Sequence, residues 1–242
     1  MARPARHGAT RKIALLFFPA AVFVNGVIRA LIFDFDGLIL DTESALISAY
    51  ADVHRTHGVP FDRAEYLRAV GHSDFVFDPW HGFAKEIDRE KLEAERTARN
   101  RARDVELPIL PGVVELLDAA RERDLRVGLA SNSSRGHCVR HLTRVGLLQR
   151  FDFLACRGEA PSPKPEPDLY KLVLGQFGLR GHEAIAFEDS PAGSLAARRA
   201  NCHVVVAPGP ATAHHDFPDA DLCVTSLAEV ALDELVTRFS PS

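Results

Sequence analysis

The sequence has few cysteines, no long apolar run and no excess of positive charge. Its four cysteines lie far apart and form no C-x-x-C pair, which argues against a zinc site or a disulfide framework. We expect them to be buried thiols in a reducing, cytoplasmic compartment. The net charge of −4 offers no general attraction to nucleic acid or to an anionic membrane surface. With 46% apolar and 26% charged residues, the 242-residue chain is expected to be a soluble globular monomer.

The start of the chain differs in composition from the rest. Residues 1–26 contain four basic side chains and no acid, and the apolar run 13–24 within them is too short to span a bilayer. Two interpretations stay open, an export signal or a true translation start near Val27, and we favour the second. In either case we expect residues 1–27 to lie outside the fold.

From Ile28 onward, apolar β-rich runs alternate with helical segments. The run 28–35 is typical of a buried strand in a parallel sheet. Further strands are predicted at 125–130, 151–155, 184–188, 203–207 and 222–224, and helices at 113–123, 136–145, 167–177, 191–200 and 227–238. This alternation predicts an α/β fold, a Rossmann-like parallel sheet with helices on both faces.

Residues 43–105 interrupt that alternation after the first strand. A helix is predicted at 43–57, and the charge-dense stretch 61–105 is also predicted to be helical. The sequence therefore predicts an all-helical cap domain at 43–105, inserted into a core made of residues 28–42 and 106–242.

Polar side chains occupy the positions where the predicted strands end. Acids, hydroxyls, an amide and one lysine occur there: Asp34, Asp36, Ser131, Asn132, Lys164, Glu188 and Asp189. In open α/β sheets the ligand binds beyond the carboxyl ends of the strands, so we expect these side chains to converge. Hard carboxylate oxygens suit Mg²⁺. Each residue alone has a plain explanation as a turn or a helix cap, but their convergence favours a site.

Four short motifs at these positions resemble those of the haloacid dehalogenase-like superfamily. They are Asp-Phe-Asp-Gly at 34–37 with Asp-Thr-Glu-Ser at 41–44, Leu-Ala-Ser-Asn at 129–132, Lys-Pro-Glu-Pro-Asp at 164–168 and Phe-Glu-Asp-Ser at 187–190. The resemblance covers roughly residues 28–238. The helical insert is similar to the cap of the subgroup that holds phosphoglycolate phosphatases, sugar-phosphate phosphatases and β-phosphoglucomutase.

The resemblance implies a Mg²⁺-dependent phosphatase that hydrolyses a small phosphorylated metabolite through an aspartyl-phosphate. It makes Asp34 the nucleophile and Asp36 the general acid/base, which suits one attacking carboxylate beside one that moves protons. The implied phosphate-binding residues are Ser131, Asn132 and Lys164. The implied metal ligands are Asp34, Asp36, Glu188 and Asp189. Candidate substrate contacts in the cap are Arg68, His72 and Lys85.

Two other functions stay open, a β-phosphoglucomutase-like mutase and a catalytically idle metabolite-binding protein. The mutase has a cap histidine at a position that is Leu46 here, which weakens that alternative. His137 and His141 lie four residues apart on a predicted helix without further metal ligands, so we interpret them as an exposed helix face. Asn201 replaces a usual glycine after the fourth motif, and we expect it to adopt left-handed geometry.

Overall fold

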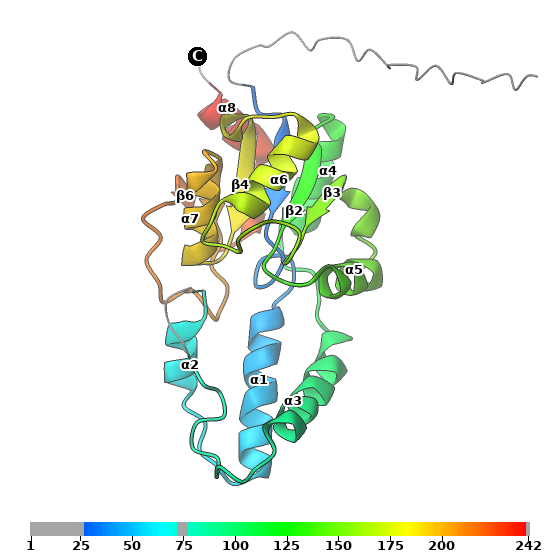
Figure 1. Cartoon of the computed structure of the whole chain (residues 1–242). Helices are drawn as coiled ribbons and strands as arrows, with labels where there is room; N and C mark the ends of the chain where they lie inside the picture. Colours follow the sequence, from blue (N-terminus) through cyan, green and yellow to red (C-terminus); the bar gives the residue numbers. More distant parts are fainter. Residues whose placement is uncertain (1–26, 72–76, 241–242) are drawn as a thin grey trace, which may run out of the picture.

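Figure 1 shows a computed structural model of the chain, which describes residues 27–71 and 77–240. The predicted leader, apart from Val27, and the cap candidate His72 lie outside the described residues. In the described ranges, no helix is long and apolar enough to cross a bilayer. The chain forms a lobe with a sheet and its covering helices, and three helices lie beyond one edge of that sheet (Figure 1).

One parallel six-stranded sheet forms the centre of the larger lobe, in the order β3-β2-β1-β4-β5-β6. The strands are β1 (Ala30–Phe33), β2 (Arg126–Ala130), β3 (Phe153–Ala155), β4 (Ala184–Glu188), β5 (His203–Val206) and β6 (Leu222–Cys223). Phe33 pairs in register with Leu129 on one side and with Phe187 on the other. The residues that follow β1, β2 and β4 therefore emerge together at one edge.

Helices cover both faces of this sheet. Successive side chains of β1 point to opposite faces, so Phe33 packs in one apolar cluster and Ile32 in another. The first cluster lies under α4 (Val113–Glu122), α5 (Arg135–Arg144) and α8 (Leu232–Phe239), and the second under α6 (Asp168–Phe177) and α7 (Pro191–Arg199). Burial on both faces explains the continuous apolar strands, and the predicted fold class is confirmed.

Three helices follow β1 and are called the cap helices after the predicted cap: α1 (Thr42–Thr56), α2 (Arg63–Ala69) and α3 (Arg89–Asp104). The prediction of helix throughout 61–105 is wrong for residues 77–88, which form turns. Pro79 has no N–H to donate, and Gly82 has a φ of +93°, so this stretch does not continue a helix.

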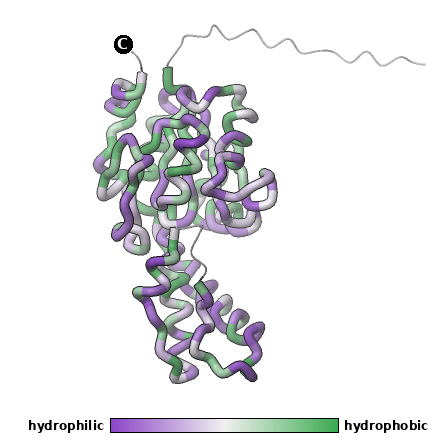
Figure 2. Tube along the Cα trace, turned by 60° about the vertical axis from the view of Figure 1, so that its left-hand side comes forward, coloured by the Kyte–Doolittle hydropathy of each residue, from purple (hydrophilic) through white to green (hydrophobic). Residues whose placement is uncertain are grey.

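The cap helices bury apolar side chains of their own. Val53, Trp80 and Leu92 form a cluster separate from the two that cover the sheet. Figure 2 shows the two lobes joined at a narrow waist, with hydrophobic residues concentrated in the lobe that holds the sheet.

Short 3₁₀ segments complete the described fold: η1 (Leu148–Arg150), η2 (Gly181–Glu183) and η3 (Leu227–Glu229). The last predicted helix, 227–238, is divided between η3 and α8 because Val230 and Ala231 are extended. Asn201 has a φ of +61°, which confirms its expected left-handed geometry.

Candidate active site

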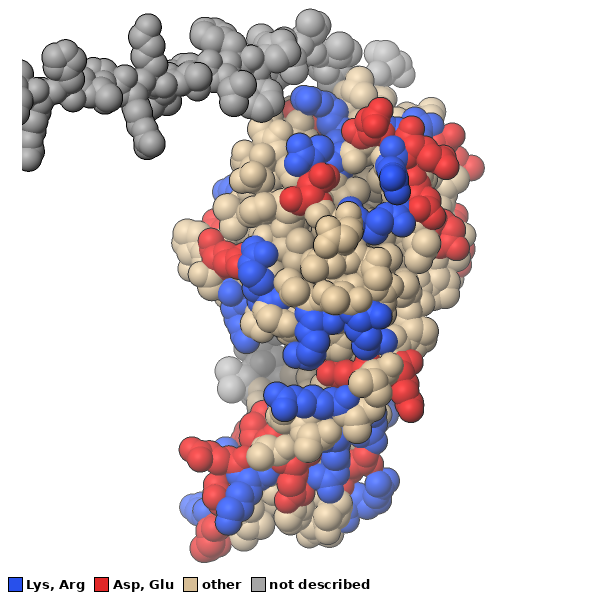
Figure 3. All heavy atoms as spheres, turned by 90° about the vertical axis from the view of Figure 1, so that its right-hand side faces the viewer, with Lys and Arg blue, Asp and Glu red and all other residues tan. Residues whose placement is uncertain are grey.

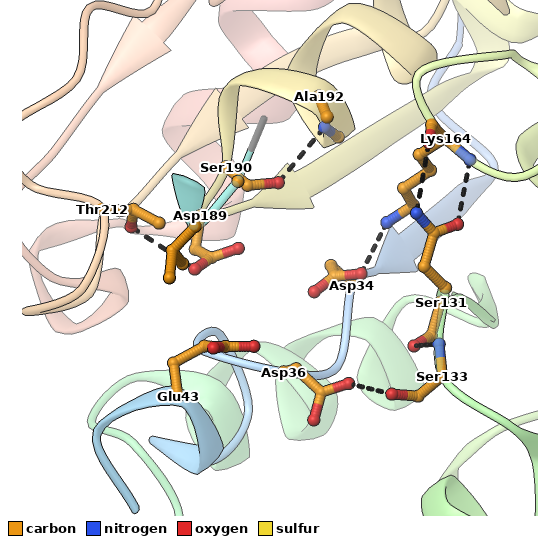
Figure 4. A pocket seen from close by; sticks show the side chains of 14 residues that line it. Asp34, Asp36, Glu43, Ser131, Ser133, Lys164, Asp189, Ser190, Ala192 and Thr212 are labelled. Atoms are coloured by element: carbon orange, nitrogen blue, oxygen red, sulfur yellow. Dashed lines mark hydrogen bonds and ion pairs between the residues drawn. The ribbon is translucent and has the colours of Figure 1, made fainter. Parts of the chain in front are cut away.

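A cavity of about 250 Å³ opens at the carboxyl edge of the sheet, on the side that faces the cap helices. Figure 4 shows acidic groups, hydroxyls and one ammonium converging on it from β1, β2, β4 and the loop after β3. Its polar lining includes Asp34, Asp36, Glu43, Ser131, Lys164 and Asp189. The predicted convergence of strand ends is therefore present in the structure.

Lys164 joins two buried carboxylates, one of which, Asp34, lines this cavity. Its Nζ lies 2.5 Å from Asp34 Oδ1 and also donates to Glu188 Oε1. The Tyr170 hydroxyl donates to the same Glu188 oxygen at 2.5 Å. Burial alone would lower the pKa of Lys164, but the charges of Asp34 and Glu188 raise it, so the side chain stays an ammonium.

The three carboxylates near Lys164 would together carry more negative charge than this one lysine can neutralise. Oxygens of Asp34, Glu188 and Asp189 lie within 4.8 Å of one another, and all three residues are buried. Burial raises the pKa of Asp34 to about 8, outweighing the lowering by Lys164, and raises the pKa of Asp189 well above its usual range. Among the described residues that line the cavity, only Lys164 is basic. A divalent cation bound by oxygens fits this donor set.

Gly37 gives Asp189 the room it needs beside the first motif. A Cβ at Gly37 would lie 2.2 Å from Asp189 Oδ2, and the residue has a φ of +79°. Glycine alone meets both demands without strain. Thr212 Oγ1 approaches the same carboxylate oxygen at 3.4 Å.

Ser131 and Asn132 follow β2 but have different surroundings. Ser131 is buried in the cavity wall, and its Oγ accepts from the Ser133 N–H at 3.0 Å. The Asn132 side chain accepts from Lys164 N at 2.9 Å and donates to Lys164 O at 3.2 Å. Asn132, predicted to bind phosphate, thus has its amide engaged in fixing the backbone of the lysine loop.

Asp36 is held by three donors, of which Figure 4 shows Ser133. Its Oδ1 lies 2.7 Å from Thr42 Oγ1 and 2.9 Å from His137 Nε2, and its Oδ2 lies 2.6 Å from Ser133 Oγ. Burial alone would raise the pKa of Asp36, but the hydrogen bonds from His137 and from the two hydroxyls hold that pKa below its usual value.

The interpretation of His137 and His141 as an exposed helix face is wrong. The His137 side chain is 23% exposed and contacts Asp36. His141 is 1% exposed, with its Nε2 3.3 Å from Asp104 Oδ2 at the end of α3. Their helix packs against the waist, so the face that carries them is turned inward.

Sequence reasoning also missed Glu43, Ser133 and His137 as site residues. Burial, followed by the nearby charges of Asp36 and Asp41, raises the pKa of Glu43 to about 7. Glu43 is itself a motif residue and Ser133 directly follows one, which is a signal that could have identified them. His137 has no such signal, because its contact depends on the placement of α5.

Two cap candidates lie away from the cavity. Arg68 and Lys85 are exposed, and neither lines it. The backbone just before His72 does reach the core, since Val70 and Gly71 line the cavity and Gly71 O accepts from Ala192 N at 3.0 Å.

A second cavity, of about 450 Å³, lies at the waist and shares Asp36, Glu43 and Ser133 with the first. Its basic residues come from α3, α5 and the loop after β3: Arg96, Arg101, Arg140 and Arg157. Figure 3 shows Lys and Arg on both sides of the waist, with acidic residues between them. This arrangement gives an acidic protein local positive charge beside the candidate site.

The chain is similar to proteins named as phosphatases. It is 34% identical to the putative phosphatase YhcW of Bacillus subtilis, over 88% of this chain and 99% of that protein. It is 34% identical to hexitol phosphatase B of Escherichia coli, over 86% of this chain and 97% of that protein. A crystal structure of CbbY from Rhodobacter sphaeroides with phosphate superposes with a TM-score of 0.66 at 28% identity, over 84% of this chain and 96% of that one.

The family model for haloacid dehalogenase-like hydrolases matches residues 31–207, which contain all four motifs. The chain belongs to the haloacid dehalogenase-like hydrolase family and is a phosphoric monoester hydrolase.

Proposed function

We propose that the chain hydrolyses the phosphate monoester of a small sugar or polyol, with Asp34 as nucleophile and with Mg²⁺ bound. The observation that carries this proposal is the buried group of Asp34, Lys164 and Asp189 in the wall of one cavity, with Glu188 buried behind Lys164. Such a group can neutralise a phosphate, present a carboxylate to it and exclude most water.

In the first step, an Asp34 oxygen forms a bond to phosphorus while the bond from phosphorus to the leaving oxygen breaks. Asp36 donates a proton to that leaving oxygen, so the product departs as an alcohol. In the second step, Asp36 takes a proton from a water molecule, which attacks the phosphorus and releases Asp34 and inorganic phosphate.

The remaining residues bind and orient the phosphoryl group. Lys164 and the Ser131 hydroxyl would contact its oxygens, and Asn132 would hold Lys164 in place through the two backbone hydrogen bonds. Asp34, Glu188, Asp189 and the carbonyl of Asp36 would hold Mg²⁺, which when bound supplies positive charge against the phosphate.

A sugar or polyol substrate is supported by Glu43 and by the relatives. The Glu43 carboxyl lines the cavity beside Asp36, where it can accept a hydrogen bond from a substrate hydroxyl. Hexitol phosphatase B is among the similar proteins. The mutase alternative is not favoured, since Leu46 occupies the position of the mutase histidine.

Three thiols, Cys138, Cys156 and Cys202, are buried and unpaired, and Cys223 is exposed and also unpaired. Free thiols in these positions support a reducing, cytoplasmic location.

The test is phosphate release from a panel of hexitol phosphates, aldose and ketose phosphates and phosphoglycolate, with Mg²⁺ and with chelator. We expect release from sugar or polyol phosphates, loss of activity in chelator and recovery when Mg²⁺ is returned. Full activity in chelator would exclude the metal requirement. Isomerisation of a sugar phosphate that depends on added bisphosphate would identify a mutase instead.

A further inference from the structure

We propose that His137 is a positioning residue for Asp36, which it orients so that Oδ2 is the oxygen that exchanges the proton with the leaving group. This inference rests on the proposed function, because it concerns how the general acid/base is held. It adds a residue from α5 that lies outside the four motifs.

The two oxygens of Asp36 have different surroundings. Oδ1 accepts from both Thr42 Oγ1 and His137 Nε2, whereas Oδ2 accepts from Ser133 Oγ. A carboxylate oxygen has two lone pairs, so Oδ1 is saturated and Oδ2 keeps one position for a proton. Asp36 lines the cavity that also holds Asp34, where that proton is needed.

The orientation of His137 is itself fixed. Arg140 Nη2 lies 3.3 Å from His137 Nδ1, and because a guanidinium only donates, Nδ1 must accept. The two contacts therefore place an N–H on Nε2, directed at Asp36 Oδ1. The ring stands edge-on to Phe35, with centroids 5.5 Å apart and planes at 89°.

His137 reaches Asp36 from the core and not from the cap. Its N–H lies 3.3 Å from Ser134 Oγ, the N-cap of α5, so the residue belongs to the first turn of a well-anchored helix. Ser133 lies just before that helix, whereas Thr42 begins cap helix α1. Two of the three donors thus come from α5 and the residue just before its N-cap.

Removing the imidazole leaves each Asp36 oxygen with one hydroxyl donor, Thr42 on Oδ1 and Ser133 on Oδ2. Oδ1 is then no longer saturated, and the carboxylate is held less firmly about its Cβ–Cγ bond. Proton transfer from Asp36 then loses its fixed geometry. Attack by Asp34 and the contact of Lys164 with the phosphoryl group are unchanged. The loss of kcat/KM should be larger when the leaving oxygen is more basic, because a poor leaving group depends more on being protonated.

The test compares kcat/KM for two esters of similar shape, phenyl phosphate and 4-nitrophenyl phosphate, the second of which releases a much more acidic phenol. For His137→Ala we expect a loss at least about tenfold larger on phenyl phosphate than on 4-nitrophenyl phosphate. His137→Gln, which keeps a donor N–H, should recover part of the loss. His182→Ala, at an exposed histidine of η2, should change neither value.

A second arm uses Asp36→Asn. With the acid/base removed there is nothing to position, so adding His137→Ala should change kcat/KM by less than about twofold. Equal losses on the two esters, or full additivity with Asp36→Asn, would overturn the role of His137. If the wild-type enzyme releases no phosphate from the sugar and polyol phosphates, or if Asp34→Asn stays active, the proposed function itself fails. Thermal unfolding of each variant separates loss of the fold from loss of the proton step.

Discussion

Asp34 and Lys164 form a buried ion pair in which one carboxylate can be replaced by an amide of the same shape. Asp34→Asn should lower kcat by at least about a thousandfold, because an amide cannot form the aspartyl-phosphate. Lys164 keeps Glu188 as a partner, so the thermal unfolding temperature should change by only a few degrees. Turnover above about a thousandth of the wild-type rate would exclude the covalent route.

Gly37 offers a test of the metal site that leaves every ligand in place. In Gly37→Ala the new Cβ would collide with Asp189 Oδ2, so the Mg²⁺ concentration for half-maximal activity should rise at least about tenfold. Gly58→Ala is the matched control, because Gly58 also has a positive φ, +67°, but no atom lies within 4 Å of its added Cβ. If both variants raise the Mg²⁺ concentration for half-maximal activity equally, the rise is caused by backbone strain and not by displacement of Asp189.

Among the individual site residues, those that directly follow strands could be predicted from the sequence. Asp34 and Asp189 could be placed because parallel strands end at one edge. His137 could not, because helical periodicity says which residues share a face but not which face is buried. That depends on how α5 packs against Phe35.

Among the elements, the strands and most core helices could be predicted within one or two residues. Their apolar runs are long and bounded by glycine, proline or capping residues. The wrong prediction of helix between α2 and α3 has a local cause, since charge density cannot distinguish a solvated helix from a solvated turn. Pro79 and Gly82 were the available signals.

The cap helices can be tested as one element. We propose that residues 43–105 form a cap domain, because the cluster of Val53, Trp80 and Leu92 is separate from the two clusters that cover the sheet. Replacing 43–105 with a short linker, while keeping Thr42, should leave slow hydrolysis of 4-nitrophenyl phosphate and abolish the ranking among natural sugar phosphates. Unchanged selectivity would show that the core alone chooses the substrate.

Across the whole molecule, the acidic site should make stability depend on both pH and metal. Burial raises the pKa of Asp34 to about 8 in the metal-free protein, and raises the pKa of Asp189 in the same direction. Carboxyls with raised pKa values take up protons on folding, so the stability they contribute is complete below about pH 4 and is lost as pH rises to about 8.

We therefore expect the unfolding temperature in chelator to fall between pH 5 and pH 8. The free energy of unfolding should decrease by up to about 1.4 kcal/mol per pH unit for each proton involved. Mg²⁺ should stabilise the protein more at pH 8 than at pH 5, because it binds the ionised carboxylates. Asp34→Asn should reduce the fall of the unfolding temperature with pH in chelator. A melting temperature in chelator that stays constant or rises between pH 5 and pH 8 would contradict the raised pKa values of Asp34 and Asp189.

The position of β1 has a consequence for the order in which the protein is made. β1 lies between β2 and β4, so both of its hydrogen-bonding edges wait for residues that the ribosome adds much later, from Arg126 and from Ala184. Until then the emerging chain carries an entirely apolar, unpaired strand, the kind of segment that aggregates or recruits chaperones. A nascent chain stopped before β4 should thus be unable to acquire protease resistance, however complete its cap helices are.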